Sequence, residues 1–321
     1  MALRILGRGE RVEERRDVET IEKRGLTLAL ALGLGAAAAP MVLVYVLLVL
    51  TSFAEQVVTG PDLLTGAVRW TLENWAAVLS GQLSVVFRGV LTANLYAALL
   101  NTLLVALGVS GVVVLASSLA AYAFSRMRFA GRDALMQFIL LLHAFPGVAL
   151  LIGVYLVYLA GLRALFYGVS GGLARTAYVI GYTILARASL EIPMSIWMMK
   201  GFFDRIPWEV EWSALVDGAS RLRVWREILL PQVKPGLAAL AIFSFLAGWE
   251  DFVYVYVFMY LGTGGQYNTL ATLIEQAVGN IETAELPLVA ALGVLYLLPT
   301  LLFFLLTQRL LLETYAGGVK G

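Results

Sequence analysis

The chain has 321 residues, of which 60% are apolar and 14% are charged, whereas soluble domains average about 45–50% apolar and about 25% charged residues. This composition excludes an ordinary soluble enzyme and predicts that most of the chain faces lipid or other membrane helices. The net charge of +1 gives no field that would attract nucleic acid. The lack of cysteine excludes disulfides and thiolate chemistry, and a single histidine leaves little for a metal site or a catalytic relay. We therefore expect no metal site and no catalytic residue.

Six apolar stretches of the chain are long enough to cross a membrane. Four contain no Asp, Glu, Lys or Arg, and two are interrupted, one by Arg187 and Glu191 and the other by Glu250 and Asp251. A helical span needs about 20 mostly apolar residues, because the hydrocarbon layer is about 30 Å thick and each residue rises about 1.5 Å. Backbone polar groups cannot stay unpaired in lipid, so these spans must be helices. The sequence therefore predicts an all-α integral membrane protein with six transmembrane helices, at residues 27–52, 96–124, 134–159, 177–199, 236–260 and 287–308.

The distribution of basic residues predicts the orientation of these spans. An even number of spans puts both termini on one side, and 18 of the 23 Lys and Arg residues fall in the segments on that side. Because basic residues gather in cytoplasmic loops, both termini are predicted to be cytoplasmic. A cleaved signal peptide is disfavoured, since the first span is too long and the residues before it are mixed in charge.

The predicted domains follow from these spans. Residues 1–26 form a cytoplasmic arm with dense mixed charge, which we expect to be a short solvated helix or disordered. After the first span, residues 53–95 form the longest external loop, with turn chemistry at Gly60-Pro61. Residues 96–308 form the membrane core, and residues 309–321 form a cytoplasmic tail.

One histidine and two charged residues lie inside the third and fourth predicted spans. His143 lies beside Phe145-Pro146-Gly147, and a lone membrane histidine is expected to be hydrogen-bonded within the bundle rather than to bind a ligand. Arg187 and Glu191 are four residues apart, so they share one helix face and can neutralise each other. Charges at this depth usually face the bundle interior or a wet cavity, which leaves open a structural pair or a role in transport.

The cytoplasmic segment 199–235 has the pattern of two short amphipathic helices. Glu209 and Glu211 follow a proline near the positive end of the first helix, Gly218 suits a left-handed cap, and Ser220 can cap the second helix. Apolar residues recur at helical spacing at Trp208, Trp212, Leu215, Leu222, Trp225 and Leu229. Such helices either lie flat on the bilayer or dock into a groove on a cytoplasmic partner.

This segment resembles the EAA loop of ATP-binding-cassette importer permeases. The resemblance is carried by Trp212-Ser213-Ala214, by Gly218 after three more residues, and by Ile228-Leu229-Leu230-Pro231 after nine more. Other segments similar to the sugar-importer branch are Asn101-Thr102, 122–129, Lys200–Phe203, Asp217–Ser220 and Trp249–Phe252, and residues 316–321 resemble the tail of the maltose-type subunit. The likeness extends from about Gly25 to the end of the chain.

The resemblance implies a transport subunit rather than an enzyme. It implies one half of an alternating-access pathway for a sugar, such as maltose, a maltodextrin or trehalose, in the cell membrane. The implied partners are a second permease subunit that completes a heterodimer, a homodimeric ATPase that holds ATP and Mg, and an extracytoplasmic sugar-binding protein; this chain itself would bind no cofactor. The residues implied to couple to the ATPase are Glu209, Glu211, Trp212, Ser213, Ala214, Asp217, Gly218, Ala219, Ile228, Leu230 and Pro231.

The sequence departs from the family pattern at the first EAA position. The family's glutamate is replaced by Trp212 and its first alanine by Ser213. Glu211 lies one residue earlier and points about 100° around the helix, so it is an imperfect substitute for that glutamate. Trp212 can instead supply buried apolar area, as aromatic residues often do at interfaces.

By resemblance, the segment Trp249–Phe252 lies near the translocation path. The carboxylates of Glu250 and Asp251 suit sugar hydroxyls, and the rings of Trp249 and Phe252 can stack on a pyranose. The alternative is a structural pairing of these carboxylates with Arg187 or His143.

Two other functions are compatible with a membrane protein of this composition. An ion-gradient-driven secondary transporter would use Glu250, Asp251 and Arg187 as a relay, but such folds tend to show inverted repeats, which we do not find. A membrane anchor without a transport role would leave the intramembrane charges unexplained. The sequence contains no Walker A motif, so ATP would have to be hydrolysed by another chain.

Overall fold

A computed structural model describes residues 3–81, 94–168, 172–279 and 285–317, with side chains described within these ranges from residue 26 to 305. The α-helices are α1 (Leu3–Ser52), α2 (Gly60–Thr65), α3 (Glu73–Ser80), α5 (Leu95–Arg126), α6 (Arg132–His143), α7 (Gly147–Phe166), α8 (Leu173–Asp204), α9 (Trp208–Val216), α10 (Arg221–Arg223), α11 (Leu230–Gln232), α12 (Lys234–Trp249), α13 (Leu270–Gly279) and α14 (Leu286–Gly317). Val224–Leu229 and Val255–Tyr260 are π-helical, and Leu261–Thr263 is a 3₁₀ turn. In the described ranges the sole β pairing is one bridge between Ala54 and Trp70.

Five helical stretches are long and apolar enough to cross a membrane. They are Leu26–Ser52, Leu95–Arg126, Gly147–Phe166, Leu173–Asp204 and Leu286–Leu305. A sixth is reached by joining α12 to the segment before it, Arg221–Gln232, across a bend of 86°. The all-α membrane fold predicted from the sequence is confirmed.

Two predicted spans are interrupted in the structure. The third, predicted as one helix over 134–159, is divided into α6 and α7 by a break at residues 144–146. Pro146 explains the break, because it lacks an N–H and disfavours helical geometry at the residue before it. The fifth, predicted over 236–260, breaks at residues 250–252 before the π-helical turn.

The N-terminal arm is helical, which is one of the two forms expected for it, but it is not a separate short helix. Residues 3–26 continue as helix into the first span, so that α1 is one helix of 50 residues rather than a short arm followed by a span.

The core of the bundle is formed by α5, α8 and α12. Gly248 allows α12 to lie close against α5, because a Cβ at this position would be 2.9 Å from the Ala106 Cα and 3.1 Å from the Val109 Cβ. In a membrane the hydrophobic effect does not drive helices together, because lipid tails are as apolar as the side chains. Helices therefore associate mainly through close packing, which small residues allow.

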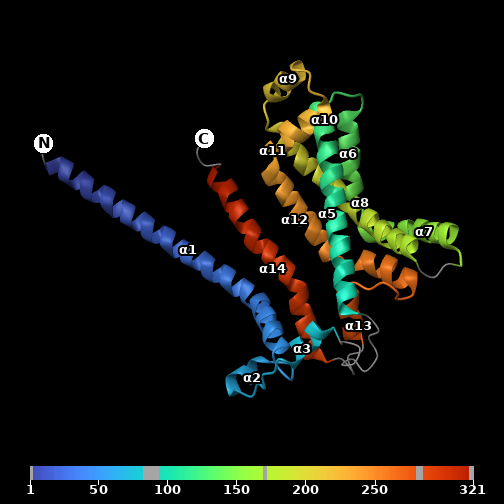
Figure 1. The fold of residues 1–321 in the computed structure, drawn as a ribbon. Coiled ribbons are helices and arrows are strands. Elements are labelled where there is room, and N and C mark those ends of the chain that lie inside the picture. Colours follow the sequence, from blue (N-terminus) through green and yellow to red (C-terminus); the bar gives the residue numbers. More distant parts are fainter. Residues whose placement is uncertain (1–2, 82–93, 169–171, 280–284, 318–321) are drawn as a thin grey trace.

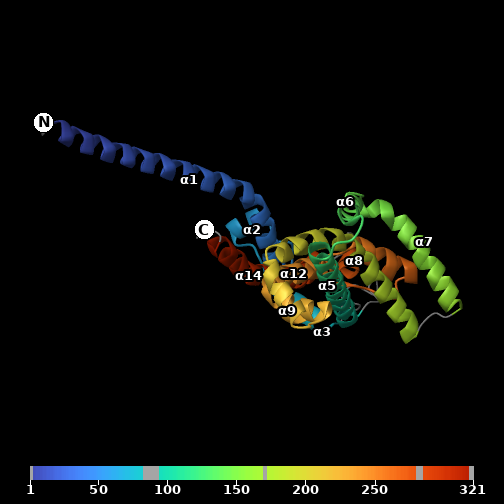
Figure 2. The same ribbon diagram turned by 90° about the horizontal axis from the view of Figure 1, so that it is seen from above.

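The two ends of the bundle carry different structures. Figure 1 shows α9 at one end, and α2 and α3 at the opposite end. The beginning of α1 and the end of α14 point toward the α9 end (Figure 1). Seen from above, α1 runs away from the bundle on one side and α7 lies on the other flank (Figure 2).

Candidate functional site

The loop at residues 199–235 forms two short helical segments joined by a tight turn. Pro207 precedes α9, and the turn after α9 is made by Gly218 with φ +86°, a conformation that glycine adopts without strain. The Ala219 N–H donates to the Ala214 carbonyl at 3.0 Å, which closes the turn. The Ser220 hydroxyl accepts a hydrogen bond from the Arg223 N–H at 3.3 Å and caps the second segment, as the sequence predicts.

The loop has an inner face and an outer face. On the inner face, Ala214, Leu215 and Ile228 pack against a buried core that includes Trp225 and Leu229. The outer face is apolar and exposed: Trp208, Trp212, Val216 and Leu222 are 42%, 59%, 82% and 63% accessible. We call these four residues the loop's outer face. Exposed apolar side chains of this kind are typical of surfaces that contact another protein or the membrane.

The predicted coupling residues divide between these environments. Glu209, Trp212, Ser213, Asp217, Gly218 and Pro231 are exposed, whereas Ala214, Ala219, Ile228 and Leu230 are half-buried. Glu211 is buried, with 2% of its surface accessible. The expectation that Glu211 could substitute in part for the family's glutamate at a partner surface is therefore corrected: its side chain points into the bundle.

Glu211 belongs to a buried polar cluster that fixes α9 to the end of α5. The Tyr122 hydroxyl donates to Glu211 Oε1 at 2.9 Å, and Arg126 Nε lies 3.6 Å from Glu211 Oε2. Arg126 also donates to the carbonyls of Phe203 and Ile206, at 2.7 and 2.6 Å. We call Tyr122, Arg126 and Glu211 the α5–α9 cluster.

Sequence reasoning did not identify this cluster. In the sequence, Tyr122 and Arg126 belong to a segment similar to the sugar-importer branch, and their spacing gives no connection with Glu211. One signal in the sequence could have indicated the cluster. Glu211 lies on the apolar side of a predicted amphipathic helix, and an acidic side chain that is buried must have a polar partner.

A second polar group lines a cavity at the level of the helix breaks. The cavity has a volume of about 560 Å³ and lies between the α6–α7 break, the middle of α8 and the break after α12. Its polar lining consists of His143, Arg187, Ser189, Glu191, Asp251 and Tyr254. Arg187 connects two carboxylates: its Nη1 is 2.9 Å from Glu191 Oε1 and its Nε is 3.3 Å from Asp251 Oδ1. The predicted pairing of Arg187 with Glu191 is confirmed, and Asp251 is a second partner.

Several of these side chains are hydrogen-bonded to backbone groups around the cavity, and Asp251 pairs with N–H groups that the break after α12 leaves open. Asp251 Oδ2 accepts from the N–H groups of Tyr254 and Val255, both at 3.1 Å. The Tyr254 hydroxyl donates to the Gly147 carbonyl at 3.1 Å. The His143 Nδ1 lies 3.1 Å from the Leu190 carbonyl, as expected for a histidine hydrogen-bonded within the bundle. Broken helices are tolerated at membrane depth where such groups find partners.

The structure separates the four residues predicted to line the path. Of Trp249–Phe252, Asp251 alone lines the cavity. Trp249 is buried, and its Nε1 donates to the Tyr296 carbonyl at 2.9 Å. Glu250 accepts from the Thr300 hydroxyl at 3.0 Å, so both residues face α14. The expectation that Trp249 stacks on a pyranose is corrected, because its ring is packed between Phe245 and Tyr296.

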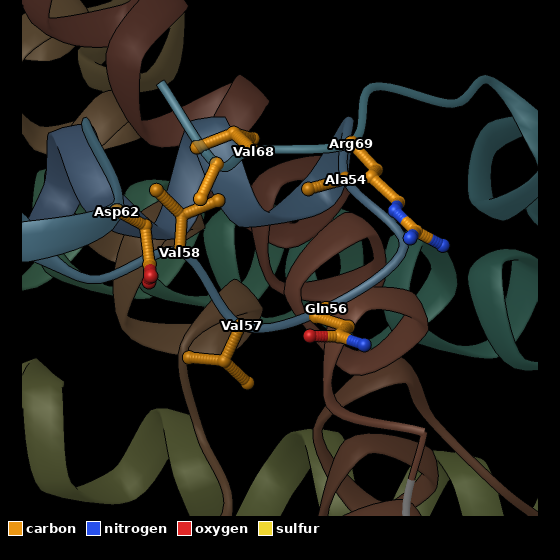
Figure 3. Close-up of a pocket in the computed structure, with 8 residues that line it drawn as sticks. Ala54, Gln56, Val57, Val58, Asp62, Val68 and Arg69 are labelled. Atoms are coloured by element: carbon orange, nitrogen blue, oxygen red, sulfur yellow. The ribbon is translucent and has the colours of Figure 1, made fainter. Parts of the chain in front are cut away.

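A third feature lies at the opposite end, where the chain leaves the first span. A cavity of about 280 Å³ is lined there by residues from 54 to 69, and Figure 3 shows Asp62 and Arg69 on opposite sides of it. The hydroxyl and the N–H of Thr59 both donate to Asp62 at the start of α2. These hydrogen bonds lower the pKa of Asp62 below the ordinary aspartate value.

Comparison with known proteins gives a consistent result. The family described as "Binding-protein-dependent transport system inner membrane component" matches residues 113–312. The maltodextrin transport system permease protein MdxG of Bacillus subtilis (strain 168) is 33% identical over 274 residues, which cover 83% of this chain and 92% of that protein. The trehalose/maltose transport system permease protein MalG of Thermococcus litoralis is 28% identical over 276 residues, covering 85% of this chain and 90% of that protein.

A solved structure has the same fold. It is that of a bacterial ABC transporter involved in the import of the acidic polysaccharide alginate. One of its chains superposes with a TM-score of 0.54 at 16% identity, covering 89% of this chain and 95% of that chain.

Proposed function

The chain belongs to the family of inner membrane components of binding-protein-dependent transport systems, and from this premise we propose that it forms half of the pathway of an ATP-driven sugar importer. The cargo that we propose is an α-glucoside such as maltose, a maltodextrin or trehalose, because relatives that transport such sugars align with most of this chain. The partners would be a second permease subunit, a homodimeric ATPase that binds ATP and Mg, and an extracytoplasmic sugar-binding protein. Both termini would be cytoplasmic.

The observation that carries this proposal is the loop's outer face. Four apolar side chains of the loop, Trp208, Trp212, Val216 and Leu222, are exposed. Three of them belong to α9, which lies at the end of the bundle opposite α2 and α3 (Figure 1). In the proposed assembly they dock into a cleft of the ATPase, with Trp212 as the residue that buries most apolar area. Docking would then rest on apolar contact at the position where the family has a glutamate.

The α5–α9 cluster supports a mechanical role for the loop. Arg126 is hydrogen-bonded to the last turn of α8 and to the chain that follows it, and Tyr122 and Arg126 both contact Glu211. Closure of the ATPase would therefore displace α9 together with α5 and α8 as one body, which is the kind of rigid-body rearrangement that alternating access requires.

The test is purification of the tagged chain from membranes in mild detergent, with the bound subunits identified and counted by mass spectrometry. We expect one second permease subunit and two ATPase subunits per chain. Trp212→Ala should lower the amount of ATPase retained at least tenfold, because it removes the central apolar contact.

Trp70→Ala is the matched control, since Trp70 is also exposed (57%) but lies between α2 and α3, where it should leave the ATPase bound. A chain that purifies alone or as a homo-oligomer, with uptake that follows a proton or sodium gradient, would support the secondary-transporter alternative instead.

A further inference from the structure

The cavity between α6, α8 and the break after α12 has the size and the lining of a small-molecule site. Its volume of about 560 Å³ falls within the range of about 300–1,000 Å³ that is typical of ligand pockets. Most of its lining is apolar, and a few polar groups converge on it, which is the usual composition of such sites.

Two of these polar groups keep hydrogen-bonding capacity. Glu191 uses Oε1 to bind Arg187, and its second oxygen, Oε2, has no hydrogen-bond partner among the residues that the structure describes. Arg187 Nη2 likewise donates no hydrogen bond to any residue in the described part of the chain. The side chains are 15% accessible for Arg187 and 31% for Glu191, so both remain reachable from the cavity. A charged acceptor and a charged donor held side by side match two adjacent hydroxyls of a sugar ring.

The cavity also offers an apolar surface next to these groups. Phe145, at the break between α6 and α7, is 54% accessible and lines the same cavity. An aromatic ring can cover the C–H face of a pyranose while Glu191 and Arg187 bind its edge. Phe145 is thus placed for the role that sequence reasoning gave to Trp249, which is buried against α14.

The charge of the lining distinguishes between classes of saccharide. Arg187 carries one positive charge against the two negative charges of Glu191 and Asp251, and His143 is counted as neutral, so the lining has a net charge of −1. Inside a membrane protein, where the dielectric constant is low, a carboxylate brought next to Glu191 is repelled more strongly than in water. The solved transporter of the same fold is involved in the import of an acidic polysaccharide, so the fold alone does not set this preference.

We propose that this cavity is a subsite for one uncharged pyranose unit, in which Glu191 and Arg187 bind adjacent hydroxyls, Phe145 covers the ring face, and the net negative charge rejects acidic saccharides. The proposal rests on the proposed sugar-import function and assigns part of its selectivity to this chain rather than to the external binding protein.

The test is a calorimetric binding measurement on the assembled transporter, purified without the binding protein, so that the selectivity of that protein does not contribute. The probes are maltotriose and a disaccharide of glucose and glucuronic acid. We expect maltotriose to bind at least tenfold more tightly than the acidic disaccharide. Glu191→Gln should weaken maltotriose binding about tenfold, the typical effect of losing a hydrogen bond to a charged group, and should narrow the difference between the two probes.

Two further variants make the result decisive. Phe145→Ala leaves the ion pairs intact, and it should weaken maltotriose binding several-fold while the acidic disaccharide stays excluded. Glu73→Gln removes an exposed carboxylate at the start of α3 and should change neither affinity. Co-elution with the ATPase verifies that each variant is assembled.

The outcomes separate this inference from the proposed function. Equal binding of the two probes, no measurable maltotriose binding to the wild type, or unchanged affinity in both Glu191→Gln and Phe145→Ala would overturn the subsite. This holds even if the same complex takes up maltotriose with ATP once it is placed in proteoliposomes and the binding protein is added. A complex without ATPase, or without any ATP-driven uptake, would overturn the proposed function and the subsite with it.

Discussion

At the scale of single residues, Arg126 and Glu211 are the most deeply buried ion pair in the part of the chain that the structure describes. Their side chains are 1% and 3% accessible. Removing one partner of a buried pair leaves the other charge uncompensated, which typically costs about 3–5 kcal/mol, whereas exposed pairs contribute little. The same loop contains an exposed pair, Arg223–Glu227, with accessibilities of 66% and 56%.

Arg126→Met should therefore lower the free energy of unfolding in detergent by about 3–5 kcal/mol, because Glu211 loses its counter-charge and two carbonyls lose their donor. Arg223→Met is the matched control and should produce no measurable change, although the neighbouring Glu227 raises the pKa of Arg223. Denaturant unfolding followed by circular dichroism measures both. Equal effects of the two substitutions would mean that the α5–α9 cluster has no special role.

At the scale of elements, the turn after α9 depends on one glycine. Gly218 has φ +86°, and a Cβ built on it would meet nothing within 4 Å. The cost of a substitution at this position is therefore backbone strain alone, about 1–2 kcal/mol for most residues and less for asparagine, which tolerates left-handed geometry.

Substitutions of Gly218 that increase the backbone strain step by step test whether the turn sets the position of the loop. ATPase retention should decrease from wild type through Gly218→Asn and Gly218→Ala to Gly218→Val, since a β-branched residue is least compatible with positive φ. Co-purification with the ATPase measures the order. Retention that is the same across the series would show that the turn does not set the docking position.

Gly248 tests a different property, the contact between two helices. An added methyl group would lie 2.9 Å from the backbone of Ala106, which cannot move as a flexible side chain could. Gly248→Ala should force α12 away from α5 and destabilise the protein by about 1–3 kcal/mol, the usual cost of overpacking.

Gly111→Ala on α5 is the control for Gly248→Ala. A Cβ at Gly111 meets nothing within 4 Å, so this substitution should be neutral or slightly stabilising. Thermal unfolding in detergent compares the two variants, and a similar melting temperature for both would contradict the packing argument.

The elements also show what the sequence can predict. The helices and caps of the coupling loop were predictable because Gly218 and Ser220 act on their immediate neighbours. The break in the third span was missed because apolar residues continue across Pro146 and composition alone shows no boundary. The contact of Tyr122 with Glu211 joins residues 89 positions apart, and helical periodicity carries no information on such pairs.

At the scale of the whole molecule, the loop's outer face and the polar cavity lie on one connected framework. The α5–α9 cluster joins the loop to α5, and α5 packs against α8, which carries Arg187 and Glu191 into the cavity. A displacement imposed at α9 would thus reach the cavity through packed helices. The sequence predicted the loop and the Arg187–Glu191 pair separately, and the structure shows how they are connected.

The most direct test of the central claim is uptake of radiolabelled maltotriose into proteoliposomes that contain the assembled transporter. The binding protein is supplied on the external face and ATP on the ATPase face. We predict accumulation that requires ATP and the binding protein together and is unchanged when proton and sodium gradients are collapsed. Accumulation that is driven by either gradient without ATP would contradict the assignment of this chain to an ATP-driven importer.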